Sequence, residues 1–151
     1  MKKTYNNWGD VYSIEFDIVI TKKPTTTLSV FHFTATNNNC CNDGDRIPAF
    51  WVNSNKFVFR ASIGGNYNHA YDSFDFVLGK SYHIAIKQST DGSKYWFEII
   101  INGNSQSKVE NKFGAKSYST VNLYTGDPWY EPFSFEFGSV CNLKIKQGGT
   151  F

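Results

Sequence analysis

Residues 11–20 read VYSIEFDIVI, a stretch in which apolar and polar side chains alternate. One face of such a strand carries Tyr12, Ile14 and Phe16, because successive side chains of an extended chain point to opposite sides. Further strands are predicted over 28–34, 47–52, 57–63, 73–77, 81–88, 94–101, 105–110, 120–124, 133–137 and 140–146. No stretch of helical period exceeds about two turns, against roughly three in a typical helix. The chain is therefore predicted to be all-β.

The connections between these strands favour an antiparallel sandwich. Asn102-Gly103 predicts a type I′ hairpin, because both central residues of that turn need positive φ. Asp91-Gly92 predicts a second hairpin, and residues 64–69 are predicted to form an exposed loop. Turn signals about every 8–12 residues indicate two sheets packed face to face. We expect one domain over 1–151, in which residues 1–10 are an N-terminal extension.

Charge and hydropathy narrow the possible functions. The chain has 15 basic and 13 acidic residues, a net charge of +2. A nucleic-acid-binding domain shows a clustered basic surface, so we expect no nucleic-acid partner. No apolar run is long enough to span a bilayer, so we expect no membrane span. Met1-Lys2-Lys3 is followed by polar residues and not by the apolar core of a signal peptide. We expect a secreted protein whose signal has already been removed.

The three cysteines leave the disulfide pattern open. A bridge from Cys40 or Cys41 to Cys141 would join an early loop to the last strand and leave one thiol over. A vicinal Cys40–Cys41 bridge and three free thiols are the alternatives. The spacing does not choose among these three patterns.

Six segments carry a family likeness: GDRIPAFWV (44–52), KFVFR (56–60), GKSYHIAI (79–86), FEIIING (97–103), VNLY (121–124) and GSVCNLKI (138–145). Together they resemble a laminin-G-like domain, which implies the concanavalin A-like jelly-roll sandwich. The resemblance supports the fold better than any one function. The loops 40–48 and 126–130 also resemble those of secreted invertebrate lectin-like proteins. No cysteine lies between Cys41 and Cys141, so the bridge usual in laminin-G domains is absent.

The first strand superficially resembles the catalytic strand of jelly-roll glucanases. Glu15 and Asp17 lie on one face of it, but the third position of that face is Val19. Retaining glycoside hydrolysis needs two working carboxyl groups about 5 Å apart, one of them with a raised pKa. Because a carboxylate is missing, we interpret this face as the polar side of a strand and expect no enzyme.

Residues 42–45 (NDGD) form the most suggestive polar cluster. Calcium takes about six to eight oxygen ligands from adaptable loops. The resemblance implies such a site at the rim of the sandwich, where Asp45 and Asp127 would be the ligands. The alternative is that these residues only make turns and that Asp45 pairs with Arg46.

Two loops carry the residue types that recognise sugars. Aromatic rings pack on the C–H side of a pyranose, while Asp, Asn and Arg form hydrogen bonds with its hydroxyl groups. Residues 127–130 (DPWY) and 64–69 (GGNYNH) supply both types. The alternative for Trp129 is an inward plug over the end of the sandwich. The candidate ligand-binding residues are Asp43, Asp45, Arg46, Asn66, Tyr67, His69, Asp127, Trp129 and Tyr130.

We therefore expect a non-catalytic, lectin-like extracellular module that binds a glycan or glycoprotein, with calcium as its candidate cofactor. The alternative is a protein-interaction or matrix-adhesion module, a role that laminin-G-like domains also serve. A degenerate glycan hydrolase is the third hypothesis.

Overall fold

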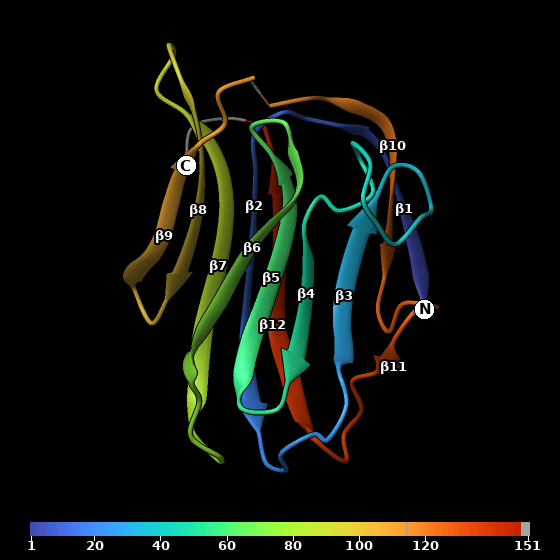
Figure 1. The fold of residues 1–151 in the computed structure, drawn as a ribbon, viewed down its shortest axis with the longest axis vertical. Coiled ribbons are helices and arrows are strands. Elements are labelled where there is room, and N and C mark those ends of the chain that lie inside the picture. The colour runs from blue at the N-terminus through green and yellow to red at the C-terminus, as the bar shows by residue number, and fades with distance from the viewer. Residues whose placement is uncertain (114, 149–151) are drawn as a thin grey trace.

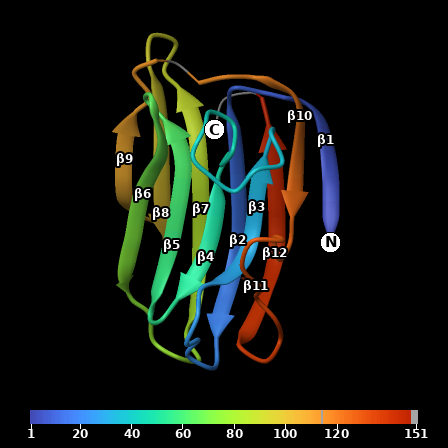
Figure 2. The same cartoon turned by 45° about the vertical axis from the view of Figure 1, so that its right-hand side comes forward.

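The computed structural model describes residues 1–113 and 115–148. Within those ranges the chain forms twelve strands and no helix, arranged as two sheets packed face to face (Figure 1; Figure 2). Sheet A runs β1 (Lys2–Trp8), β10 (Tyr118–Tyr124), β3 (Leu28–Thr34), β4 (Ala49–Asn53), β5 (Lys56–Ile63) and β6 (Asn66–Asp75), with β11 (Glu131–Pro132) beside β3. Sheet B runs β12 (Gly138–Gln147), β2 (Tyr12–Ile20), β7 (Ser81–Thr90), β8 (Tyr95–Ile101) and β9 (Asn104–Glu110). The predicted jelly-roll sandwich is confirmed.

The core lies between the sheets because the strands direct alternate side chains inward. In β2, Ile14, Phe16 and Ile18 are fully buried, as the alternation predicts. The ring of Phe16 meets sheet A, where its centroid lies 5.2 Å from that of Phe31 and 5.1 Å from that of Phe50. Removing such large rings from water is a major stabilising contribution to a sandwich of this size.

Residues 1–10, predicted as an N-terminal extension, contribute the edge strand β1. It pairs with β10 in a register that runs from Lys2 opposite Tyr124 to Trp8 opposite Tyr118. Its side chains are mostly polar and exposed, so no apolar alternation marks it as a strand. Trp8 is fully buried, with its ring centroid 5.3 Å from that of Tyr12. This tryptophan anchors the edge strand to the core.

Two other segments differ from the strand predictions. Residues 66–69 do not form a loop but begin β6, and only Gly64 and Gly65 make the turn, with φ of +59° and +82°. Residues 133–137 do not form a strand. They make a turn ahead of β12, in which the amide of Phe137 donates to the carbonyl of Ser134.

Both predicted hairpins join the strands that the sequence indicates. Asn102 and Gly103 have φ of +51° and +78°, which confirms the two-residue turn between β8 and β9. Asp91 and Gly92 lie in a longer connection between β7 and β8. There the Oδ1 of Asp91 accepts hydrogen bonds from the amides of Ser93 and Lys94.

The two ends of the sandwich carry different loops (Figure 1). The upper end holds the β3–β4 loop, the β5–β6 turn and the β9–β10 connection. The lower end holds the β2–β3 loop, the β4–β5 hairpin, the β6–β7 loop and the turn before β12. The described part of the chain contains no helix with the length and hydropathy needed to cross a membrane.

Candidate functional site

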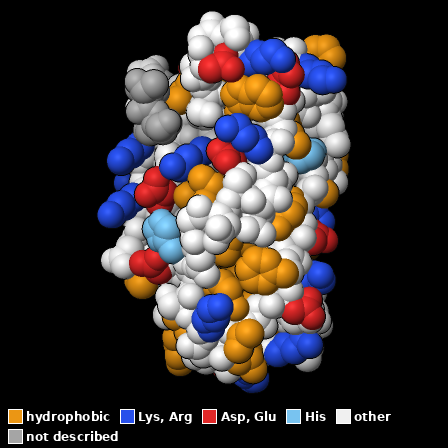
Figure 3. Space-filling model, turned by 90° about the vertical axis from the view of Figure 1, so that its left-hand side faces the viewer, with side chains coloured by type: hydrophobic (Ala, Val, Ile, Leu, Met, Phe, Trp, Pro, Cys, Tyr) orange, Lys and Arg blue, Asp and Glu red, His pale blue; other side chains and the backbone are white. Residues whose placement is uncertain are grey.

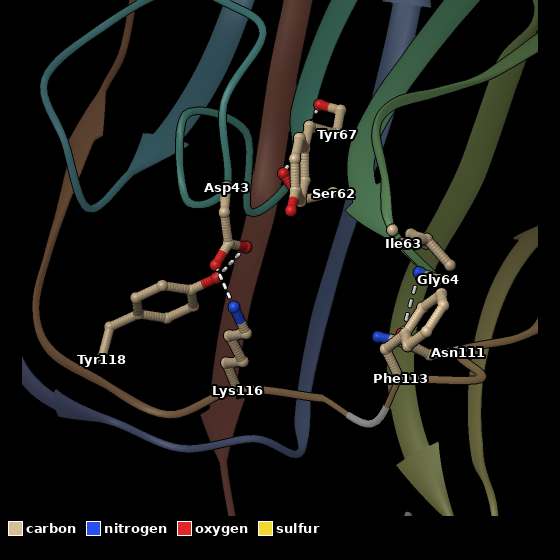
Figure 4. Close-up of a pocket in the computed structure, with 10 residues that line it drawn as sticks. Asp43, Ser62, Ile63, Gly64, Tyr67, Asn111, Phe113, Lys116 and Tyr118 are labelled. Carbon is tan, nitrogen blue, oxygen red and sulfur yellow. Dashed lines mark hydrogen bonds and ion pairs between the residues drawn. The ribbon is translucent and has the colours of Figure 1, made fainter.

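A cavity of about 330 Å³ opens at the upper end of the sandwich (Figure 4). Its volume lies at the small end of the range of about 300–1,000 Å³ that is typical of ligand sites. Side chains and backbone from the β3–β4 loop, β5, β6 and the β9–β10 connection surround it: Asp43, Ser62, Ile63, Gly64, Gly65, Tyr67, Asn111, Phe113, Lys116 and Tyr118. We call this cavity the rim pocket.

One wall of the rim pocket is an ion pair with a neighbouring phenol (Figure 4). The Nζ of Lys116 contacts the Oδ2 of Asp43, and the phenol of Tyr118 donates to Oδ1 over 3.3 Å. Burial and the adjacent Asp43 raise the pKa of Tyr118, so its phenol stays neutral and remains a donor. Asp43 also raises the pKa of Lys116. The wall therefore carries both signs of charge close together.

The opposite wall depends on the Gly64-Gly65 turn. Positive φ at both positions favours glycine. A Cβ at Gly65 would lie 2.9 Å from the ring of Phe113, so that ring packs directly on the backbone of the turn. The Oδ1 of Asn111 accepts a hydrogen bond of 2.9 Å from the amide of Gly64. Phe113 is 79% exposed and presents its ring to the pocket mouth.

The third side of the pocket offers hydrogen-bonding groups that a ligand can use. Tyr67 is 42% exposed, and its phenol oxygen has no hydrogen-bond partner among the described residues. The hydroxyl of Ser62 makes one long bond, 3.4 Å, to the carbonyl of Tyr67. Lys116 has three N–H donors, of which Asp43 uses one. Ring faces, donors and acceptors thus converge on one small cavity.

Asp45 lies behind the pocket and is fully buried. Its Oδ1 accepts from the hydroxyl of Thr36, and its Oδ2 accepts from the backbone and side-chain nitrogens of Asn42 at 2.8 and 3.3 Å. Within this loop Cys40 and Cys41 form the vicinal disulfide, while Cys141 is a free, exposed cysteine on β12. Asp45 therefore holds the shape of the loop that carries Asp43.

Arg46 is also buried and does not pair with Asp45. Its Nε donates to the carbonyl of Asn39 over 2.8 Å, and its Nη1 contacts the side-chain oxygen of Asn68. The guanidinium lies 4.9 Å from the ring centroid of Trp51. Burial lowers the pKa of Arg46. The side chain ties the β3–β4 loop to the outer face of sheet A.

Asp127 organises a second aromatic cluster on the same face of sheet A. Its Oδ1 accepts from the amides of Trp129 and Tyr130, while its Oδ2 accepts from the hydroxyl of Ser29 over 2.7 Å. Burial acts to raise the pKa of Asp127, but His32, Ser29 and the Trp129 amide together outweigh it. The pKa therefore lies below its usual value.

The two aromatic side chains that follow Asp127 fold onto the sheet. The ring centroid of Trp129 lies 5.0 Å from that of His32, and that of Tyr130 lies 5.4 Å from that of Trp51. Both side chains are partly buried. Trp129 thus occupies the position of a plug, and Tyr130 covers Trp51.

The proposed calcium ligands are separated by a histidine. The Nε2 of His32 lies 2.7 Å from the carbonyl oxygen of Asp45, and its Nδ1 lies 3.4 Å from the Oδ2 of Asp127. Both carboxylates are already committed to hydrogen bonds, and no group of three or more acidic, histidine or cysteine side chains suited to a metal occurs in 1–113 and 115–148. This donor set does not fit calcium.

Glu15 and Asp17, the carboxylates of the glucanase-like strand, lie on the outer face of sheet B. The Nδ1 of His83 is 2.7 Å from the Oδ1 of Asp17, and the Nζ of Lys87 is 3.9 Å from Glu15. Hydrogen bonds from Asn142 and His83 lower the pKa of Asp17. A carboxyl that acts as the acid in hydrolysis needs the opposite shift.

Of the candidate residues in the sequence, the structure brings Asp43 and Tyr67 together in the rim pocket. Asn66 instead accepts a hydrogen bond from the amide of Asn68, and His69 lies on the edge strand, where burial and Arg60 lower its pKa. Sequence reasoning missed Ser62. It also missed four residues near the start of β10, for which the mixture of aromatic and polar residues over 111–118 was the available signal: Asn111, Phe113, Lys116 and Tyr118.

A scan of protein families and a search of curated proteins find no match to the chain. Solved structures match in fold. A pentraxin from Limulus polyphemus is 15% identical, with a TM-score of 0.62 over 95% of this chain and 66% of its own. A PL7 alginate lyase from Zobellia galactanivorans is 12% identical, with a TM-score of 0.60 over 94% and 65%. Sheep galectin-11 is 10% identical, with a TM-score of 0.50 over 97% and 96%.

These likenesses establish a lectin-type, concanavalin A-like jelly roll and no more than that. The chain spans just under two thirds of the length of the pentraxin and of the lyase. Lyases stand beside pentraxin and galectin among the similar structures, so the fold itself does not choose between binding and catalysis.

Proposed function

We propose that this protein is a non-catalytic, lectin-like module that binds a glycan in the rim pocket. The observation that carries the proposal is the convergence of Tyr67, Phe113 and the Asp43–Lys116 pair on one cavity of about 330 Å³. Ring faces complement the apolar side of a sugar, and paired donors and acceptors complement its hydroxyl groups. A secreted location is part of the proposal, because disulfides such as Cys40–Cys41 persist in oxidising compartments.

The chemistry of the pocket favours a neutral sugar. Lys116 and Asp43 compensate each other, so neither a carboxylated nor an aminated sugar gains an unopposed ion pair. The volume suits one or two sugar units and not a long chain. We therefore expect the terminal part of a neutral glycan to be recognised.

The number of carboxylates supports binding without catalysis. Among the residues that line the rim pocket, Asp43 is the single carboxylate, whereas glycoside hydrolysis commonly uses two. The proposal also uses no calcium, since Asp45 and Asp127 are committed to hydrogen bonds. Glycan binding is expected to be equally strong in calcium and in chelator.

A glycan array followed by titration of the best ligand tests the proposal. Tyr67→Ala should weaken binding about tenfold or more, because it removes a ring face from the pocket. Phe74→Ala is the matched control: Phe74 lies in the same strand β6 and is 45% exposed, against 42% for Tyr67. This control should bind as the unmutated protein does, and both variants should melt within a few degrees of it.

Two results would reject the proposal. One is equal binding by the Tyr67 and Phe74 variants. The other is an array without binding, combined with capture of a matrix protein that Tyr67→Ala abolishes. The second result would support the alternative of a protein-interaction module. Turnover of any bound glycan, followed by chromatography of the products, would contradict the absence of catalysis.

A further inference from the structure

The lower end of the sandwich exposes large apolar side chains in its loops. Phe74, Val77 and Leu78, at the β6–β7 connection, are 45%, 60% and 50% exposed, and Phe135, in the turn before β12, is 95% exposed. The rim pocket lies at the opposite end. Exposed apolar side chains that gather in one place usually mark an interaction surface.

These loops meet at the end of β2. The amide of Gly79 donates to the carbonyl of Ile20 over 2.8 Å, and the amide of Thr21 donates to the carbonyl of Phe137 over the same distance. The β4–β5 hairpin joins them, because the amide of Phe76 donates to the carbonyl of Asn55. We call residues 21–24, 53–56, 74–80 and 134–137 together the apolar tip. Its segments are far apart in sequence but are fixed to one another by backbone hydrogen bonds.

Basic side chains surround the apolar residues of the tip. The apolar tip contains four lysines and two carboxylates, which gives it a net positive charge. Lys22 pairs with Glu136, and Lys56 lies 3.5 Å from Asp75. Lys23 and Lys80 have no carboxylate within 4 Å in the described part of the chain. In Figure 3 the lower end shows hydrophobic side chains interspersed with basic ones.

We propose that the apolar tip docks on an anionic phospholipid surface. Apolar side chains enter the boundary between headgroups and acyl chains, and lysines near the surface attract anionic headgroups. Both kinds of group project from the same end of the molecule, and the surplus of lysine selects negative charge. Docking in this way leaves the rim pocket facing away from the membrane.

Co-sedimentation with sugar-free vesicles tests this inference. Vesicles of phosphatidylcholine and phosphatidylserine in equal parts should bind the unmutated protein, and vesicles of phosphatidylcholine alone should bind it far less. Added salt should weaken binding, because it screens the lysines. No binding to phosphatidylserine vesicles at low salt would overturn the proposal.

Variants with matched controls separate the contribution of the apolar side chains to vesicle binding from that of the lysines. Val77→Ser combined with Leu78→Ser should weaken vesicle binding roughly tenfold or more. Phe113→Ser, at the opposite end of the sandwich and 79% exposed, should leave it unchanged. Lys80→Gln should weaken binding about fivefold. Lys146→Gln, an exposed lysine on β12, should have no such effect. Equal effects of a tip variant and its control would overturn the proposal.

The outcome of the vesicle experiments is independent of the proposed glycan binding. The vesicles carry no sugar, so a failure of glycan recognition leaves their binding intact. The tip variants should retain glycan affinity and melting temperature, because the substituted side chains are half or more exposed. If the unmutated protein forms dimers in light scattering and the Val77→Ser/Leu78→Ser variant does not, the tip is a self-association surface and membrane docking is rejected.

Discussion

Asp45 holds the β3–β4 loop in shape through hydrogen bonds with Thr36 and Asn42. Asp45→Ala leaves the hydroxyl of Thr36 and the amide of Asn42 without their acceptor. The expected loss of unfolding free energy is about 1–3 kcal/mol, the cost of unsatisfied buried donors. Urea unfolding in calcium and in chelator should give the same loss. A loss confined to calcium-containing buffer would restore the metal hypothesis.

The lowered pKa of Asp127 leads us to expect that the folded protein loses stability in acid. Its pKa lies below the ordinary value of 3.8, so it stabilises the fold above that value and the contribution disappears as pH falls through the lowered pKa. The urea midpoint of the unmutated protein should therefore decline below about pH 4. In Asp127→Asn the decline should be shallower, with a lower midpoint at neutral pH. Parallel pH profiles of the two proteins would contradict this role.

At the level of single residues, the sequence indicated part of the lining of the rim pocket. Asp43 and Tyr67 were found because loop acids and loop aromatics are the residue types that sugars need. Lys116 and Phe113 were not, since they lie in the connection that crosses from β9 in sheet B to β10 in sheet A, where Phe113 packs on the Gly64-Gly65 turn. Such distant juxtapositions have no local signature. The role of His32 between two loops was hidden for the same reason.

Among the elements, β1 depends on one side chain. Trp8 is fully buried and its ring packs 5.2 Å from that of Phe33. Trp8→Ala should cost about 3–5 kcal/mol of unfolding free energy, and Trp8→Phe should cost less because it keeps most of the ring contact. Chemical denaturation monitored by circular dichroism measures both. A cost below 1 kcal/mol for the alanine variant would show that β1 is not anchored in this way.

In the β8–β9 hairpin, the energetic cost of the left-handed backbone conformation of the turn can be measured by itself. Gly103 has φ of +78°, and a Cβ there would meet no atom within 4 Å. Gly103→Ala should therefore cost about 1–2 kcal/mol, solely from the left-handed backbone conformation. Ser105→Ala, an exposed position in the following strand, is the control and should change stability little. A neutral Gly103→Ala in thermal unfolding would contradict the assigned turn.

The strands that the sequence indicated best are those with one buried face. β2 and β7 alternate apolar and polar side chains because sheet B has one face in the core and one in water. β1 and the first part of β6 lie at edges of sheet A and expose most of their side chains. Without a buried face there is no alternation to detect, and pairing with a distant strand alone makes these residues strands.

Across the whole molecule, the rim pocket and the apolar tip lie at opposite ends and share no residue. Sites without shared partners change free energy independently, with coupling below about 0.3–0.5 kcal/mol. A Tyr67→Ala/Leu78→Ser variant should therefore lose glycan affinity as Tyr67→Ala does and vesicle affinity as Leu78→Ser does. Isothermal titration for the glycan and sedimentation for the vesicles give the two losses. A larger coupling would mean that the ends communicate through the sheets.

The pairing of β1 with β10 also constrains how the protein is made. Lys2 is synthesised long before its partner, which is Tyr124. Sheet A therefore stays open at this edge until most of the chain has been synthesised. Folding that waits for partners so distant in sequence is slow, on the order of milliseconds to seconds for sandwiches of this kind. During that wait the polar side chains of β1 keep this unpaired segment soluble.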